Sequence, residues 1–124
     1  MGNTIQITPF MHVGDLAATL DFFTQVVGFE VLFRSPGYAY IEREGAGIRI
    51  LEAEGAPAPG RRAFRYYIDV RDLDAVHAEL KPKLDTLPAD HVFGPVDQAY
   101  GQRELLILAP DGDLLVFGAA IAKG

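Results

Sequence analysis

The most informative stretch of the sequence is residues 12–31, which read HVGDLAATLDFFTQVVGFEV. Asp15 is of a residue type that caps helix N-termini, and it stands just before an apolar series at helical spacing: Leu16, Leu20, Phe23 and Val27. Gly28 follows, and glycine readily adopts the left-handed backbone with which many helices end. The pattern predicts an amphipathic helix that begins after Asp15 and ends at Gly28.

Short β-strands are predicted on both sides of this helix. Residues Ile5–Val13 have a strand-like pattern, although Pro9 cannot donate a hydrogen bond to a neighbouring strand and favours an edge position or a bulge. Three more strand candidates follow the helix and are separated by turns that contain glycine: residues 29–34, 38–43 and 48–53. Residues 4–53 therefore predict a first βαβββ module.

The remainder of the chain predicts the same order of elements. Residues 54–62, EGAPAPGRR, contain two prolines and two glycines without an apolar period, which indicates a linker. A strand at 64–70 and a helix capped by Asp72 follow, and Pro82 is expected to shorten or kink that helix. Three strand candidates complete the series, the first of them the least regular: residues 91–96, 103–109 and 114–120. Residues 63–120 thus predict a second βαβββ module.

A repeat is also visible in the residues themselves. Four residues of the first half lie 57 positions before similar residues of the second half: Val13, Asp15, Leu16 and Phe23 before Val70, Asp72, Leu73 and Leu80. In both halves a valine ends the strand, an aspartate caps the helix, and large apolar residues are placed to face a sheet. The sequence therefore predicts one α+β domain, residues 1–124, built from two related modules.

The composition is that of a globular domain and excludes several classes of function. The 124 residues contain no cysteine, which removes disulfides and thiolate metal sites. The net charge of −6 comes without a cluster of lysine and arginine, so no nucleic acid is expected as a partner. The N-terminal residues lack a signal-peptide pattern, and no segment is apolar enough to span a membrane. We therefore expect a cytoplasmic protein that does not bind membranes.

Two segments resemble the vicinal oxygen chelate superfamily, which includes glyoxalases, bleomycin-resistance proteins and extradiol dioxygenases. Residues 12–31 resemble the opening helix of these proteins, and residues 105–118, LLILAPDGDLLVFG, resemble their closing hairpin. The resemblance implies that the two modules form a curled mixed sheet around a central cavity, with the helices outside. It also implies a homodimer and a ligand site inside the curl.

In metal-dependent members of this superfamily, four strand side chains meet at one divalent ion. The resemblance places the corresponding positions at Thr8, Glu52, Arg65 and Val116. Only the glutamate is a usual metal ligand, whereas a catalytic ion needs about three ligands from histidine, aspartate, glutamate or cysteine. The chain therefore resembles the metal-free bleomycin-resistance proteins most, and we expect no cofactor. An ion pair between Glu52 and Arg65 is expected in place of the metal.

Alternation along the strands predicts which side chains line the cavity, because successive side chains point to opposite faces. Counted from the four degenerate metal positions, the concave side also includes Phe10, Ile50, Tyr67 and Leu114. The full set of expected ligand-binding residues is Phe10, Phe33, Tyr38, Tyr40, Ile50, Glu52, Arg65, Tyr67, Tyr100, Gln102 and Leu114. An aromatic wall with few polar groups suits a flat or amphipathic small organic ligand.

Three interpretations of function follow from these residues. The favoured one is a binding protein that sequesters an aromatic or cationic compound, as bleomycin-resistance proteins do, without a catalytic residue. The alternative is an enzyme of the glyoxalase, lyase or isomerase type, with Glu52 as base and Arg65 as an electrostatic clamp on a developing enolate or carboxylate. His12, just before the first helix cap, is a further candidate base. A structural or regulatory module is the third interpretation.

Overall fold

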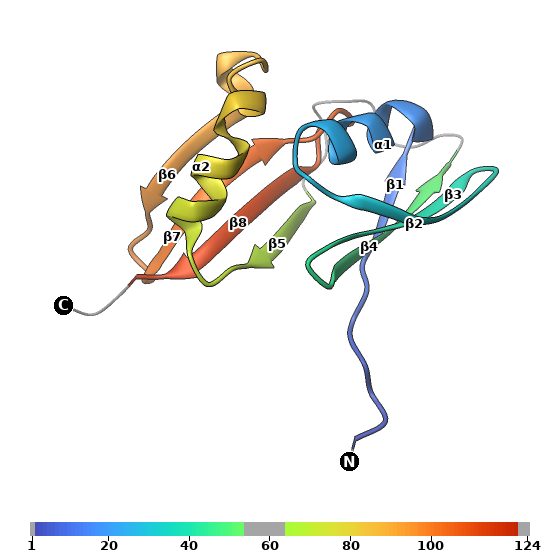
Figure 1. Ribbon diagram of the computed structural model, residues 1–124, viewed down its shortest axis with the longest axis horizontal. Coiled ribbons are helices and arrows are strands. Elements are labelled where there is room, and N and C mark those ends of the chain that lie inside the picture. The colour runs from blue at the N-terminus through green and yellow to red at the C-terminus, as the bar shows by residue number, and fades with distance from the viewer. Residues whose placement is uncertain (1, 54–63, 122–124) are drawn as a thin grey trace.

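The computed structural model describes residues 2–53 and 64–121, so the predicted linker lies outside the described residues. It confirms an α+β fold of two βαβββ modules (Figure 1). The elements of the first module are β1 Phe10–Val13, α1 Leu16–Gln25, β2 Glu30–Ser35, β3 Tyr38–Arg43 and β4 Ala46–Glu52. Those of the second module are β5 Arg65–Asp69, α2 Leu73–Leu84, the 3-10 helix η1 Ala89–His91, β6 Val92–Asp97, β7 Gln102–Leu108 and β8 Leu114–Ala120.

Each module has its own four-stranded mixed sheet. The strand order is β1-β4-β3-β2 in the first sheet and β5-β8-β7-β6 in the second. In both sheets the first strand of the module runs parallel to the last, and the other neighbours are antiparallel. The matching orders confirm the repeat seen in the sequence. The two sheets are separate, however, and do not close around one central cavity within the chain, which corrects that part of the expectation.

Both helices begin at the predicted aspartates. The Asp15 carboxylate accepts a hydrogen bond from the backbone N–H of Ala18 at 3.0 Å, and the Asp72 carboxylate accepts one from the N–H of Ala75 at 3.1 Å. Such bonds satisfy N–H groups that have no partner inside the first turn of a helix. Beyond the end of α1, Gly28 has a φ of +71°, the predicted left-handed conformation. The local signals in the sequence therefore set both helix starts.

Two elements differ from the prediction. Helix α2 continues past Pro82 and ends two residues later, at Leu84. Strand β1 begins at Phe10 rather than at Ile5. It lies at the edge of its sheet and pairs only with β4, and the preceding segment is not in a strand. Ile5 and Ile7 are consequently 95% and 93% exposed.

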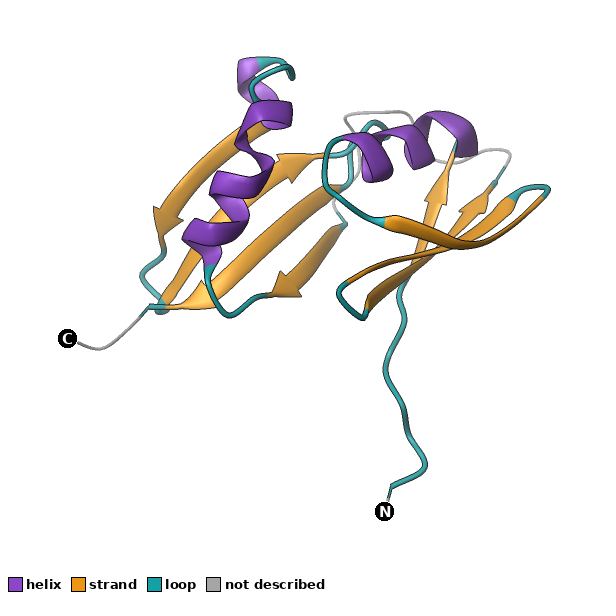
Figure 2. Ribbon diagram, in the orientation of Figure 1, coloured by secondary structure: helices purple, strands orange, loops and turns teal. Residues whose placement is uncertain are grey.

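Each helix covers one face of its sheet (Figure 2). The apolar side chains between helix and sheet belong to one buried cluster that includes residues of both modules. In the first module the Phe23 ring is fully buried, with its centroid 5.1 Å from that of Phe29. In the second module Leu80 of α2 and Phe117 of β8 are buried in the same cluster. The opposite face of each sheet carries no helix, which leaves it available for other contacts.

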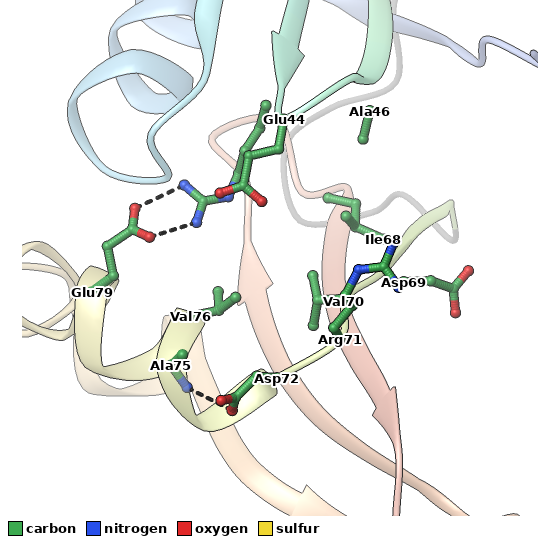
Figure 3. Close-up of a pocket in the computed structure, with 11 residues that line it drawn as sticks. Glu44, Ala46, Ile68, Asp69, Val70, Arg71, Asp72, Ala75, Val76 and Glu79 are labelled. Atoms are coloured by element: carbon green, nitrogen blue, oxygen red, sulfur yellow. Dashed lines mark hydrogen bonds and ion pairs between the residues drawn. The ribbon is translucent and has the colours of Figure 1, made fainter.

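Charged side chains join the two modules on the helix side. The guanidinium of Arg43, from β3, donates two hydrogen bonds to the carboxylate of Glu79, from α2, at 2.9 and 2.8 Å. Figure 3 marks both bonds, beside a hollow of about 650 Å³ lined mainly by β5, the following loop and α2. The Asp111 carboxylate accepts a further bond from the Gly14 N–H at 2.6 Å. Arg43 and Glu79 both line the hollow, and their charged groups pair with each other. We therefore interpret the pair as a contact that stabilises the fold rather than as a binding site.

Candidate functional site

The candidate site lies on the faces of the two sheets that carry no helix. The first helix-free face consists of the side chains that alternate with the buried core residues of β1 to β4: Phe10, His12, Phe33, Tyr38, Tyr40, Glu42, Arg49 and Leu51. The second helix-free face consists of the equivalent side chains of β5 to β8: Arg65, Tyr67, Asp69, Phe93, Gln102, Glu104, Leu106, Leu114, Val116 and Gly118. Strand alternation produces both sets.

On the first helix-free face, two tyrosines hold an arginine and a glutamate. The Arg49 guanidinium donates a hydrogen bond to the Tyr38 hydroxyl at 2.6 Å and lies 5.1 Å from the centroid of the Tyr40 ring. The Tyr40 hydroxyl donates to the Glu42 carboxylate at 2.6 Å, and this bond raises the pKa of Tyr40. The Tyr40 ring lies directly over Gly47, where any larger residue would collide with it. The face is therefore polar, with both charges present.

On the second helix-free face, a buried carboxylate lies beneath two tyrosines. Glu104 is only 2% exposed, and its oxygens accept hydrogen bonds from the Tyr100 hydroxyl at 2.7 Å and from the Gln98 amide at 3.1 Å. Tyr67 lies over Gly118, and its hydroxyl donates to the Gln102 amide oxygen at 3.3 Å. Burial, followed by the nearby Glu104 carboxylate, raises the pKa of Tyr67. Both tyrosines therefore stay protonated at neutral pH.

Most predicted ligand-binding residues lie on these two faces. The structure places them there as follows: Phe10, Phe33, Tyr38 and Tyr40 on the first, and Arg65, Tyr67, Gln102 and Leu114 on the second. Val116, expected at a metal position, lies on the second face as well. Tyr100 lies in the turn before β7, as expected, and reaches the second face through its hydroxyl. Thr8 precedes β1 and accepts a hydrogen bond from Gln6. The set is thus divided between two sheets rather than gathered in one cavity.

The predicted positions of Ile50 and Glu52 are wrong. Ile50 is fully buried in the core on the helix side of β4. Glu52 lies on that same side, and its carboxylate accepts a hydrogen bond from the N–H of Leu16, in the first turn of α1, at 2.8 Å. Among the described residues it forms no ion pair with Arg65. The expected Glu52–Arg65 pair, and a base at Glu52 on the concave face, are therefore excluded by the geometry.

The sheet register identifies the position that Glu52 was expected to fill. Val116 pairs with Tyr67, and the 57-residue repeat relates Tyr67 to Phe10. Phe10 pairs with Arg49, so Arg49 is the counterpart of Val116 in the first module. Arg65 and Val116, the metal positions expected in the second module, therefore have Thr8 and Arg49 as their counterparts in the first, and none of these four side chains is a usual metal ligand.

Other titratable groups do not gather into a metal site either. No three histidine, aspartate or glutamate side chains in residues 2–53 and 64–121 are placed to hold a metal ion together. His12 is exposed on the first helix-free face, with its ring centroid 6.3 Å from that of Phe10. His77 is half-buried on α2, and His91 lies in η1, 3.9 Å from the carboxylate of Asp90.

The residues of the faces that the sequence interpretation missed include Glu42, Arg49, Phe93 and Glu104. Alternation from Tyr38 and Tyr40 would have found Glu42, because it continues the same face of β3. Glu104 also carried a signal, since a carboxylate inside the apolar run RELLILA is unusual in a buried strand. No such signal marks Arg49, because its place depends on the register of β4.

Two βαβββ modules with matching strand orders define the class of protein. The Glyoxalase/Bleomycin resistance protein/Dioxygenase superfamily model matches residues 6–117, and the chain belongs to that superfamily. The resemblance drawn from the two sequence segments is thereby confirmed. No curated protein matches the chain. No helix among the described residues is long and apolar enough to cross a membrane.

Several solved structures share this fold over nearly their whole length. The bleomycin resistance determinant encoded on transposon Tn5 has a TM-score of 0.80 at 22% identity, with 94% of this chain and 98% of that chain covered. The bleomycin-binding protein from Streptomyces verticillus, complexed with copper(II)-bleomycin, has a TM-score of 0.78 at 23% identity, with 99% and 100% covered. TnmS3, an antibiotic binding protein from Streptomyces sp. CB03234, has a TM-score of 0.69 at 23% identity, with 96% and 99% covered. At these identities the similarity shows a common fold.

Proposed function

We propose that this chain is a binding protein that sequesters a small aromatic or cationic compound, as the antibiotic-binding members of its superfamily do. The observation that carries the proposal is the exposure of aromatic rings on the helix-free faces: 51% for Phe10, 56% for Phe33, 43% for Tyr67 and 63% for Phe93. Aromatic surface gathered on one side of a sheet is typical of ligand and partner sites. The bleomycin-binding and antibiotic-binding proteins that share the fold add support.

We propose that binding does not require a metal ion. The superfamily's metal positions hold a threonine, two arginines and a valine, and guanidinium groups repel a divalent cation rather than bind it. The lyase or isomerase alternative depended on Glu52 as base beside Arg65. Because Glu52 instead binds the start of α1, no observation now favours that alternative.

We further propose that two copies form a homodimer in the cytoplasm. The separate sheets leave both helix-free faces open in the single chain, and a second copy would cover much of this aromatic surface. Light scattering on the purified protein is expected to give twice the mass of the chain, whereas a monomer at micromolar concentration would refute this part of the proposal.

Isothermal titration with metal-free bleomycin, and with a planar antibiotic of a second chemical class, tests the function. Saturable binding of at least one compound is expected in the presence of a chelator. Tyr67→Ala and Phe93→Ala should each weaken it, because both rings are exposed on the second face. Val31→Ala is the control, since Val31 is 38% exposed and pairs with the core-facing Ile41 of β3. Equal binding by all three variants, or none by the wild type, would contradict the proposal.

A further inference from the structure

Glu104 is a buried carboxylate without a cationic partner among the described residues. Its hydrogen-bond donors are a tyrosine hydroxyl and a glutamine amide, both neutral. The adjacent Arg103 points to the opposite side of β7, where it pairs with Asp74 at 3.0 Å and with Asp97 at 2.8 Å. A carboxylate removed from water is costly unless hydrogen bonds and an opposite charge compensate it. Here the hydrogen bonds are present, but no opposite charge pairs with the carboxylate within residues 2–53 and 64–121.

Arg65 is the only basic side chain among the described residues of the second helix-free face, and it forms no ion pair with Glu104. Along β8, Arg65 pairs with Leu114 and Glu104 pairs with Gly118. These positions are four residues apart, roughly 13 Å along the strand at ~3.3 Å per residue. The hydrogen bond to Glu104 raises the pKa of Tyr100, and the charge of Arg65 opposes this rise only weakly. The charge of Glu104 therefore remains available to a ligand.

The first helix-free face shows what a compensated carboxylate looks like in this fold. There Glu42 also accepts a hydrogen bond from a tyrosine, Tyr40. The guanidinium of Arg49 stacks on that same tyrosine ring, so a positive charge accompanies the carboxylate. The second face repeats the tyrosine and the carboxylate but not the arginine. This difference predicts that a cation supplied by a ligand binds beside Glu104 on the second face, in the role that Arg49 has on the first.

The groups above Glu104 suit such a cation. Tyr67 is 43% exposed and Tyr100 is 67% exposed, so both residues are accessible from solvent. Aromatic faces attract cations within about 6 Å of the ring centroid. A hydroxyl that donates its proton to a carboxylate also becomes a better acceptor for a ligand N–H. Phe93, on β6 of the same face, supplies apolar surface for a flat ring system.

We infer that Tyr67, Tyr100 and Glu104 form a subsite for the cationic end of the ligand, an amidinium or protonated amine attached to a flat aromatic ring. This inference rests on the proposed binding function and specifies its ligand class. The cation lies against the two tyrosines, its N–H groups bond to their hydroxyl oxygens, and the buried carboxylate below supplies the negative charge. The aromatic part of the ligand lies over Phe93.

A pair of isosteric probes tests the charge directly: naphthalene-2-carboxamidine, which is cationic at neutral pH, and naphthalene-2-carboxamide, which is neutral. Isothermal titration of the full chain is expected to show about tenfold tighter binding of the amidine, the factor that 1.4 kcal/mol gives. In Glu104→Gln the two probes should bind within about twofold of each other. Asp21→Asn removes the same charge from exposed α1 and should leave the tenfold ratio unchanged.

Each outcome separates the subsite from the wider function. If the wild type binds both probes equally, or binds neither up to the limit of their solubility, the cationic subsite is refuted. The proposed binding function is then still tested independently by the titration with bleomycin. An unchanged ratio in Glu104→Gln refutes the role of the carboxylate. Should that variant fail to fold, Tyr100→Phe replaces it, because Tyr100 is exposed and loses only its hydroxyl. A full tenfold ratio in Tyr100→Phe counts against the inference.

Discussion

Replacing Glu79 with glutamine tests how the two modules are held together. The Arg43 side chain is 6% exposed and the Glu79 side chain is 55% exposed, and two hydrogen bonds join them. Hydrogen bonds to charged groups contribute about 1.5–3 kcal/mol each, and exposure of one partner reduces this value. We expect Glu79→Gln to lower the free energy of unfolding by about 2 kcal/mol, since the glutamine amide oxygen can accept only one of the two hydrogen bonds and the buried guanidinium loses the negative charge of this carboxylate.

Differential scanning calorimetry at neutral pH measures this effect. A loss of 2 kcal/mol corresponds to a melting temperature lower by about 8 °C in a chain of this length. The hydrogen bond with Arg43 lowers the pKa of Glu79, so its stabilising effect is present above the ordinary glutamate pKa, about 4.3, and is lost as the pH falls through the lowered value. The difference between wild type and Glu79→Gln should therefore shrink as the pH is lowered below about 4.

A second carboxylate on α2 supplies the control. Asp85 pairs with Lys81 at 3.0 Å, and both side chains are more than half exposed. Such pairs contribute less than about 1 kcal/mol, so Asp85→Asn should shift the melting temperature by no more than about 3 °C. If Glu79→Gln melts within 1 °C of Asp85→Asn, water replaces the carboxylate at Arg43 and the junction between the modules does not depend on this pair.

Three further results are expected. Gly28→Ala should lower the free energy of unfolding by about 1 kcal/mol more than Gly37→Ala does, as measured by chemical denaturation. Both glycines have positive φ, but only at Gly28 would the added Cβ lie 2.5 Å from a guanidinium nitrogen of Arg43. Equal losses in the two variants would mean that the guanidinium moves aside freely. Gly118→Ala should displace the Tyr67 ring and weaken ligand binding at least fivefold by titration calorimetry, with unchanged affinity as the contrary result. Spectrophotometric titration should show a tyrosine that ionises well above the usual pH, and Glu104→Gln should lower that pKa; if the curve is unaffected, Glu104 does not act on Tyr67.

The helices were predictable because their signals are local. Asp15 and Asp72 cap them through their own side chains, and Gly28 ends the first through its own backbone. The face of β4 was not predictable in the same way. Glu52 stands two residues after the core residue Ile50, and a carboxylate that binds the start of a neighbouring helix has the same sequence pattern as one inside a cavity.

The prediction that the first strand begins at Ile5 was wrong for a related reason. Ile5 and Ile7 alternate with polar residues as in a half-buried strand, but a strand also needs a neighbour to pair with, and the sequence of a single chain does not state whether one exists. Tyr38 and Tyr40 were placed on one face correctly, since alternation within one strand depends on no other element. Local periodicity was thus reliable within an element and unreliable between elements.

The two helix-free faces differ in their chemistry, and this has a consequence for the ligand that we propose. If the two βαβββ modules were chemically identical, a ligand could bind in two equivalent orientations that are related by the repeat. The two faces are not chemically identical. The first carries both Arg49 and Glu42, whereas on the second Glu104 has no cationic partner among the described residues. A ligand with one cationic end and one neutral end would then have a single preferred direction. The duplicated backbone thus carries two chemically different faces, and the difference comes from a few side chains.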